Sequence, residues 1–159
     1  MQPHTPLDVL VVDDSAVMRA MIARVLRVSG LPVGRVREAA DGAAALAALR
    51  AEPADLVLLD VNMPVMDGEE TLWRLRADDA LADTAVVVVS TEGSEARRAV
   101  LAGLGAHFVR KPFRPEALRA VVCAAVPAAA GPAAGLPHDP SPDHAHAGTP
   151  ALLDGPLDF

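Results

Sequence analysis

Residues 55–60 have the sequence Asp-Leu-Val-Leu-Leu-Asp, in which four consecutive apolar residues lie between two acids. A continuous apolar run of this length is typical of a parallel strand that helices cover on both faces. A second run, residues 9–12, is followed at once by Asp13 and Asp14. Two predicted strands therefore deliver carboxylates at their C-terminal ends. Clustered carboxylates repel and desolvate one another, so this arrangement indicates a bound divalent cation or proton chemistry.

The composition limits the class of protein. The chain has 159 residues, enough for one domain and an appendage, and 52% of them are hydrophobic. Only 3% are aromatic and the formal net charge is -7, which argues against a nucleic-acid partner. The single cysteine, Cys123, excludes an intramolecular disulfide. No segment has the roughly 20 uninterrupted apolar residues of a membrane span, and residues 1–6 lack the features of a secretion signal. We therefore expect a cytoplasmic protein without membrane insertion.

Strand-like and helix-like segments alternate five times within residues 1–126, the predicted domain. The expected strands are residues 8–12, 34–38, 56–60, 85–90 and 107–109. The expected helices are residues 15–29 and 41–51, one beginning near 67, one from 94 to 103–105, and one from 115 to 126. Such alternation predicts an α/β fold with a doubly wound parallel sheet and right-handed crossovers. In such sheets the ligand site lies beyond the C-terminal strand ends, where this sequence places its acids.

Two of these segments carry finer predictions. The strand at 34–38 contains charged residues and suits the edge of the sheet. In the helix at 15–29, apolar residues recur at three- and four-residue steps, so we expect them to face the core. They are Val17, Met18, Met21, Ile22, Val25 and Leu26. Gly30 is expected to end this helix.

The composition changes after residue 126. Residues 127–159 are rich in Pro, Ala, Gly, Asp and His and contain no Lys or Arg, so we expect a disordered C-terminal tail. Its end, residues 151–159, is acidic and apolar, with the sequence Ala-Leu-Leu-Asp-Gly-Pro-Leu-Asp-Phe. The tail is too short for a DNA-binding output domain.

Further polar residues follow the predicted strands at the same edge of the sheet. Ser90 and Thr91 come at the end of the fourth strand, and Lys111 and Pro112 follow the fifth. Each alone has an ordinary explanation, since an acid can cap a helix and a lysine is often a surface charge. Their joint occurrence with the acids after the first and third strands favours one shared site.

With these residues in place, the chain resembles the receiver domain of two-component response regulators, most closely the single-domain chemotaxis (CheY-like) type. The resemblance covers roughly residues 7–126. It is carried by the strand-end residues and by residues 60–68, Asp-Val-Asn-Met-Pro-Val-Met-Asp-Gly. It implies a flavodoxin-like (βα)5 sheet with strand order 2-1-3-4-5, and a cis bond between Lys111 and Pro112.

The resemblance also implies roles for single residues. Asp60 would be the phosphoacceptor, taking a phosphoryl group from a histidine kinase or phosphotransfer protein. Mg²⁺ would be held by the side chains of Asp13, Asp14 and Asp60 and by the backbone carbonyl of Asn62. The cation and Lys111 would offset the charge of the transferring group. The protein would not be an enzyme beyond Mg-dependent self-phosphorylation and self-dephosphorylation.

The same resemblance implies a switch. Ser90 would be the hydroxyl that turns toward the phosphoryl group, with Thr91 as the alternative if the strand register slips by one residue. Phe108 occupies the position of the switch aromatic. Asn62 and Glu92 occupy positions that tune dephosphorylation, and this pair matches the short-lived chemotaxis signal.

Output would then be protein–protein binding by a monomer, through the face formed by the fourth helix, fifth strand and fifth helix. Arginines in this part of the chain suit an acidic or acidic-apolar partner peptide: Arg97, Arg98, Arg110, Arg114 and Arg119. Residues 151–159 are either disordered or docked on this face of their own domain or of a partner.

Several other functions are compatible with the predicted fold. A phosphorylation-independent scaffold or a phosphate-sink regulator would share the receiver fold. A flavodoxin-like cofactor binder is disfavoured, because acids at two strand ends repel an anionic ligand. A phosphohydrolase with an aspartate nucleophile would need a substrate-capping insertion that is not evident in the sequence.

Overall fold

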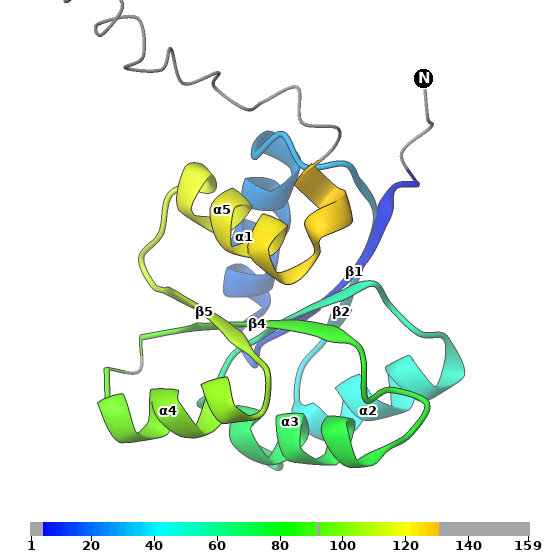
Figure 1. Ribbon diagram of the computed structural model, residues 1–159, viewed down its shortest axis with the longest axis vertical. Coiled ribbons are helices and arrows are strands. Elements are labelled where there is room, and N and C mark those ends of the chain that lie inside the picture. Colours follow the sequence, from blue (N-terminus) through cyan, green and yellow to red (C-terminus); the bar gives the residue numbers. More distant parts are fainter. Residues whose placement is uncertain (1–4, 92, 131–159) are drawn as a thin grey trace, which may run out of the picture.

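The computed structural model describes residues 5–91 and 93–130, which form a five-stranded parallel sheet with helices on both faces (Figure 1). The strands are β1 (Leu7–Val12), β2 (Val33–Ala39), β3 (Leu56–Leu59), β4 (Ala85–Ser90) and β5 (His107–Arg110). The helices are α1 (Ala16–Val28), α2 (Gly42–Ala51), α3 (Gly68–Ala77), α4 (Glu95–Gly103) and α5 (Pro115–Ala125), followed by the short 3-10 helix η1 (Pro127–Ala130). The strand order is β2-β1-β3-β4-β5, which confirms the predicted fold class and order.

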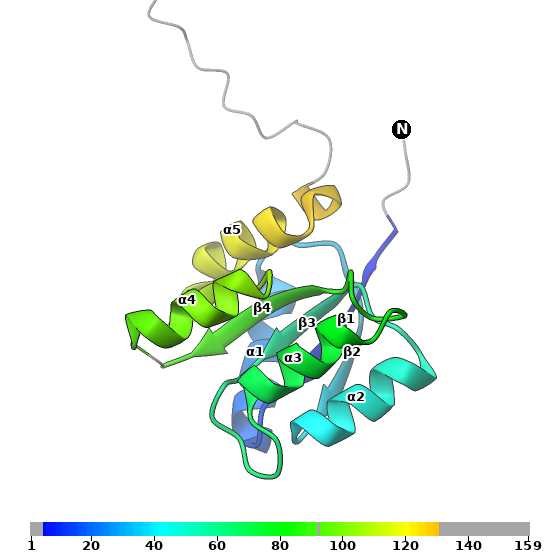
Figure 2. The ribbon, with the colours of Figure 1, turned by 60° about the horizontal axis from the view of Figure 1, so that its bottom comes forward.

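Each face of the sheet has its own apolar core. Figure 1 shows α1 and α5 on one face, and Figure 2 shows α2, α3 and α4 across the other. In β3, Leu58 packs with Ile22 and Leu118 under α1 and α5, whereas its neighbour Leu59 packs with Leu72 on the opposite side. Successive side chains of a strand point to opposite faces, so two covered faces require a continuously apolar strand. The prediction that residues 55–60 contain a parallel strand covered on both faces is therefore confirmed.

The strand at the sheet edge also agrees with its sequence. β2 pairs with β1 alone and is mostly half-buried, as its charged residues predicted. β5 forms the other edge, and its end residues His107 and Arg110 are exposed while Val109 is buried. The most apolar strands, β1, β3 and β4, occupy the centre.

Local capping sets where the helices begin. Ser15, Asp41, Asp67 and Ser94 are the N-caps of α1 to α4, and each side chain accepts a hydrogen bond from the backbone N–H three residues later. Neither acid of the pair after β1 caps α1, so the helix-cap explanation for that pair does not hold. At the other end of α1, Gly30 has a φ of 85°, which glycine adopts without strain.

The apolar stripe of α1 is wider than its buried face. Ile22 and Leu26 are buried, but Val17 is 79% exposed and Met21 is 47% exposed. The expectation that all six apolar residues face the core was therefore wrong for these two. The physical reason is that α1 packs mainly against β1, β2 and α5, which cover a narrow stripe of the helix.

The folded part extends four residues beyond the predicted domain end at residue 126. Pro127–Ala130, where we expected disorder to begin, form η1, and Ala129 is 5% exposed in the core beneath α1 and α5. Burial of this methyl group holds the turn against α5. The rest of the predicted tail, residues 131–159, and Glu92 lie outside the described residues.

Within residues 5–91 and 93–130, no helix has both the length and the apolar character needed to cross a lipid bilayer.

Candidate functional site

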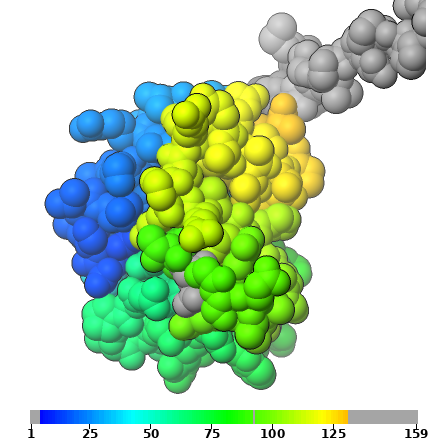
Figure 3. All heavy atoms as spheres, turned by 90° about the vertical axis from the view of Figure 1, so that its left-hand side faces the viewer, coloured from blue at the N-terminus to red at the C-terminus, as the bar shows by residue number. Residues whose placement is uncertain are grey.

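The ends of β1 and β3 bring three carboxylates together. Val12 lies opposite Leu59 in the sheet, so Asp13, Asp14 and Asp60 leave neighbouring strands at the same edge. One oxygen of each carboxylate lies within 4.8 Å of the other two. Asp13 and Asp60 are buried, whereas Asp14 is exposed, so the cluster opens to solvent on one side. Figure 3 views this edge of the molecule, where α1 (blue), α4 (green) and α5 (yellow) meet.

Lys111 reaches the acids from the end of β5. Its Nζ lies 3.0 Å from Oδ2 of Asp13 and 3.6 Å from Oδ1 of Asp60. The peptide bond to Pro112 is cis, as predicted. Three ionised carboxylates and one ammonium give the cluster a net charge of two negative units. One divalent cation would balance this charge. The donors are oxygen atoms, which Mg²⁺ prefers, so the residues fit this metal.

The carboxylate of Asp60 lies in a partly dehydrated position. The backbone N–H of Val61 donates a hydrogen bond to its Oδ1 at 2.9 Å. Burial raises the pKa of Asp60 above its ordinary value; Lys111 opposes this rise, and Asp13 and Asp14 add to it. The ionised Asp60 carboxylate is thus destabilised by its surroundings, and a bound cation would relieve that destabilisation.

The raised pKa of Asp60 leads to a prediction about stability. A group whose pKa is higher in the folded state binds protons more tightly there, so its ionised form lowers stability at neutral pH. Asp60→Asn should therefore raise the free energy of unfolding of the metal-free protein at neutral pH, on the order of 1 kcal/mol. The gain should shrink as pH falls through the raised pKa of Asp60, because the wild-type side chain then becomes neutral too. Denaturant titrations of both proteins with EDTA measure this difference, and a gain that does not change with pH would contradict the proposed cause.

The hydroxyl at the end of β4 that faces the interior belongs to Ser90. Ser90 pairs with Arg110 in β5 and is fully buried, while Thr91 is exposed. The carbonyl of Ser90 accepts a hydrogen bond from the backbone N–H of Lys111 at 3.0 Å, so the two predicted site residues are linked through the sheet edge. The register favours Ser90 over the alternative that the sequence left open; its switching role stays a prediction.

Phe108 makes a contact that the sequence did not predict. The side chain is half-buried, and the guanidinium carbon of Arg98 lies 4.5 Å from the centroid of its ring. Such cation–π contacts contribute about 0.5–1 kcal/mol at exposed sites. Arg98 on α4 and Phe108 on β5 meet only because these elements pack together, and no spacing in the sequence indicates the pair.

The loop after Asp60 is held close to the sheet. Asn62 is exposed, and Met63 and Met66 pack against the core beneath α2, α3 and α4. The backbone N–H of Gly68, the first residue of α3, donates to the carbonyl of Val61 at 2.8 Å. Asn62 therefore lies close to Asp60 along the chain, while Glu92, its predicted partner in tuning, lies outside the described residues.

The arginines predicted for the output face divide between different surfaces. Arg97 forms ion pairs with Asp67 at 3.4 Å and Glu69 at 3.3 Å. Arg119 donates a hydrogen bond to the carbonyl of Ser29, at the end of α1, at 3.4 Å. The expectation that all five make the output face basic was therefore wrong for Arg97, whose charge is compensated by two acids at the start of α3. Arg119 is exposed and keeps its charge, although it is tied to the end of α1. The other three are exposed on α4, β5 and the turn before α5: Arg98, Arg110 and Arg114.

Comparisons with known proteins give a family. Residues 9–123 match the response regulator receiver domain. The chemotaxis protein CheY1 of Helicobacter pylori is 37% identical over 116 residues, which cover 71% of this chain and 91% of CheY1. The probable transcriptional regulatory protein TcrX of Mycobacterium tuberculosis is 36% identical over 111 residues, 70% of this chain. That match spans only 46% of TcrX, so the chain corresponds to less than half of this longer relative.

Solved structures agree with this assignment. The chemotaxis protein CheY4 of Vibrio cholerae, crystallized at low pH, has 33% sequence identity and a TM-score of 0.69, covering 77% of this chain and 100% of that chain. A chain of the CheX-CheY-BeF3-Mg complex from Borrelia burgdorferi has 27% identity and a TM-score of 0.68, covering 75% and 88% of the two chains. Fold, strand-end chemistry and relatives together lead to one conclusion: the chain belongs to the family of response regulator receiver domains and is of the CheY-like type.

Proposed function

We propose that this receiver accepts a phosphoryl group on Asp60 from a phosphohistidine of a histidine kinase or phosphotransfer protein, and that it signals by binding a protein effector. The observation that supports this most is the buried Asp60 beside two further acids and Lys111. The names of CheY1 and CheY4 favour an effector in chemotaxis or motility.

The metal of this reaction would be Mg²⁺. Its ligands would be the side chains of Asp13, Asp14 and Asp60 and the backbone carbonyl of Asn62. When bound, Mg²⁺ supplies charge neutralisation for an anionic carboxylate that approaches an anionic phosphoryl group. The two uncompensated negative charges of the cluster support this assignment.

The chemical step belongs to Asp60. A carboxylate oxygen attacks phosphorus, the P–N bond to the donor imidazole breaks, and the imidazole leaves as a neutral ring because its other nitrogen keeps a proton. Lys111, already 3.6 Å from Asp60, donates to an equatorial phosphoryl oxygen and stabilises the charge there. In the separate hydrolysis step, water attacks phosphorus, the P–O bond to Asp60 breaks, inorganic phosphate leaves, and the carboxylate is restored, with Asn62 and Glu92 tuning the rate. The chain has no other catalytic activity in this proposal.

The signal would pass from the site to a surface. Ser90 is buried at the end of β4. Phe108 lies on the neighbouring strand β5, opposite Val88. Inward rotation of the Ser90 hydroxyl toward the phosphoryl group would leave space for Phe108 to repack. This repacking would change the face of α4, β5 and α5 and so the affinity for the effector.

The phosphorylation test uses a small phosphodonor. Incubation of the full chain with acetyl phosphate and Mg²⁺ should give one phosphoryl adduct by intact-protein mass spectrometry, and EDTA should prevent it. Hydroxylamine should remove the adduct, because it cleaves acyl phosphates and leaves phosphoserine and phosphothreonine intact. A wild-type protein that stays unmodified under these conditions would favour the phosphorylation-independent scaffold instead.

A further inference from the structure

The face formed by α4, β5 and α5 has two hollows lined by apolar and basic side chains. The first lies between α4 and β5, and its lining includes Arg98, Ala99, Ala102 and Phe108. The second lies between β5 and the start of α5, and its lining includes Val109, Arg110, Pro112, Phe113 and Arg114. We call this surface the arginine face, defined by Arg98, Arg110 and Arg114.

The cations of the arginine face are available for a ligand. Within the described residues, Arg98, Arg110 and Arg114 form no ion pair with a carboxylate, in contrast to Arg97. Arg98 lies over the ring of Phe108 and is itself exposed to solvent. Two acids, Glu95 and Glu116, line the same hollows, so cations exceed acids there by one. A ligand with apolar side chains and a few carboxylates would complement this surface.

A segment of the same chain has this chemistry. Residues 151–159 contain three leucines and one phenylalanine around two aspartates, Asp154 and Asp158. No lysine or arginine follows Arg119 in the sequence, so no cation near this segment repels the arginine face. Leucine side chains suit the apolar parts of the hollows, and the two carboxylates suit the guanidinium groups at their rims.

The connection is long enough to allow contact. The described structure ends at Ala130 in η1, which packs on α5, the helix whose first turn lines the second hollow. Residues 131–150 separate it from the segment, and a flexible chain of this length has a root-mean-square span of roughly 25 Å. A domain of this size has a radius of gyration of about 14 Å, so the segment can reach the face. Tethering at this length gives an effective concentration in the millimolar range, which makes a weak contact significant.

We propose that residues 151–159 dock on the arginine face of their own domain, with leucines in the hollows and Asp154 and Asp158 at the arginines. A protein effector that uses the same face must displace them. The contact would lower the affinity of the domain for weak or incorrect partners. It is independent of the proposed phosphorylation, because it forms in the unmodified protein.

Amide chemical shifts of the full, ¹⁵N-labelled chain test the docking without Mg²⁺ or a phosphodonor, so the result does not depend on the phosphorylation proposal. The comparison is between wild type and a variant with Leu152→Asp, Leu153→Asp and Leu157→Asp, which lie outside the described domain. Within the domain, docking predicts shift differences confined to residues 98–117, and these differences should decrease with added salt.

A matched pair of charge reversals locates the contact. Arg110→Glu with Arg114→Glu should abolish the shift differences, whereas Arg24→Glu with Arg27→Glu on the exposed side of α1 should leave them unchanged. Circular dichroism confirms that each variant folds. Absence of shift differences, differences centred on α1, or differences that disappear on dilution because two copies are needed would each overturn the proposal.

Discussion

Asp60→Asn is expected to abolish the phosphoryl adduct, with a rate loss of more than about 1,000-fold. The amide has nearly the shape of the carboxylate, and its oxygen can keep the hydrogen bond from Val61. It carries no charge and is a poor nucleophile, so the attack on phosphorus fails even though the site keeps its form. Intact-protein mass spectrometry after incubation with acetyl phosphate and Mg²⁺ measures the loss.

Two further substitutions make this experiment specific. Asp55→Asn changes an acid at the opposite end of β3, where Asp55 accepts a hydrogen bond from the backbone N–H of Asp8, and it should leave the adduct intact. Asp13→Asn should slow the reaction without abolishing it, because Asp13 serves as a metal ligand and as the ion-pair partner of Lys111. An adduct that persists in Asp60→Asn but is absent in Asp13→Asn would move the acceptor to Asp13.

Gly68→Ala is expected to lower the free energy of unfolding by about 2–3 kcal/mol. A Cβ at this position would overlap the carbonyl oxygen of Asp60 and lie 2.7 Å from Cα of Val61. Both are backbone atoms at the end of β3, so neither can move aside as a flexible side chain would. Denaturant unfolding followed by circular dichroism measures the change. Since the displaced backbone belongs to Asp60, the proposed phosphoacceptor, the variant should also accept phosphoryl groups more slowly than wild type.

Gly103→Ala is the matched control for this substitution. Gly103 is the last residue of α4, its φ is not in the left-handed region, and a Cβ there meets no atom within 4 Å. Alanine at such a position should leave stability within about 1 kcal/mol of wild type or raise it. Similar losses for Gly68→Ala and Gly103→Ala would show that close approach of α3 to β3 is not the cause.

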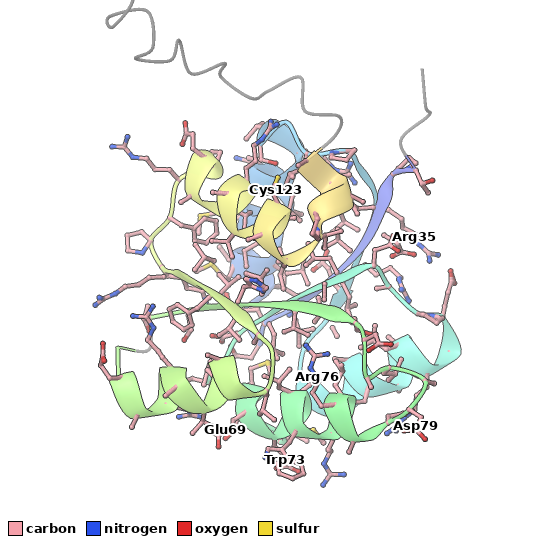
Figure 4. The ribbon with its side chains drawn as sticks, in the orientation of Figure 1. Arg35, Glu69, Trp73, Arg76, Asp79 and Cys123 are labelled. Carbon is pink, nitrogen blue, oxygen red and sulfur yellow. The ribbon has the colours of Figure 1, made fainter. Side chains whose placement is uncertain are left out.

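The sole tryptophan, Trp73, projects outward from α3 beside Glu69 (Figure 4), so its environment can report separately on α3.

Local patterns in the sequence were sufficient for the alternation of strands and helices, whereas the strand order was implied by the resemblance to receiver domains. Continuous apolar runs followed by acids predicted buried parallel strands, because strand side chains alternate between two faces that must both be covered. Ser15, Asp41, Asp67 and Ser94 are residue types that favour N-caps, and each caps its own helix. Local rules failed where burial depends on distant neighbours, as for Val17 and Met21, or where a short turn gains a tertiary contact, as for Ala129.

By itself, the sequence determined that acids, a hydroxyl and a lysine lie at one sheet edge, and its resemblance to receiver domains then indicated the family. Adjacency along the chain sets this shared edge, since residues that directly follow parallel strands emerge at the same edge. Only the tertiary structure decided that Ser90 rather than Thr91 faces inward, that Arg98 covers Phe108, and that Gly68 lies against the backbone of Asp60. These contacts join elements whose relative position follows from the packing of two separate cores, and no spacing within one segment contains that information.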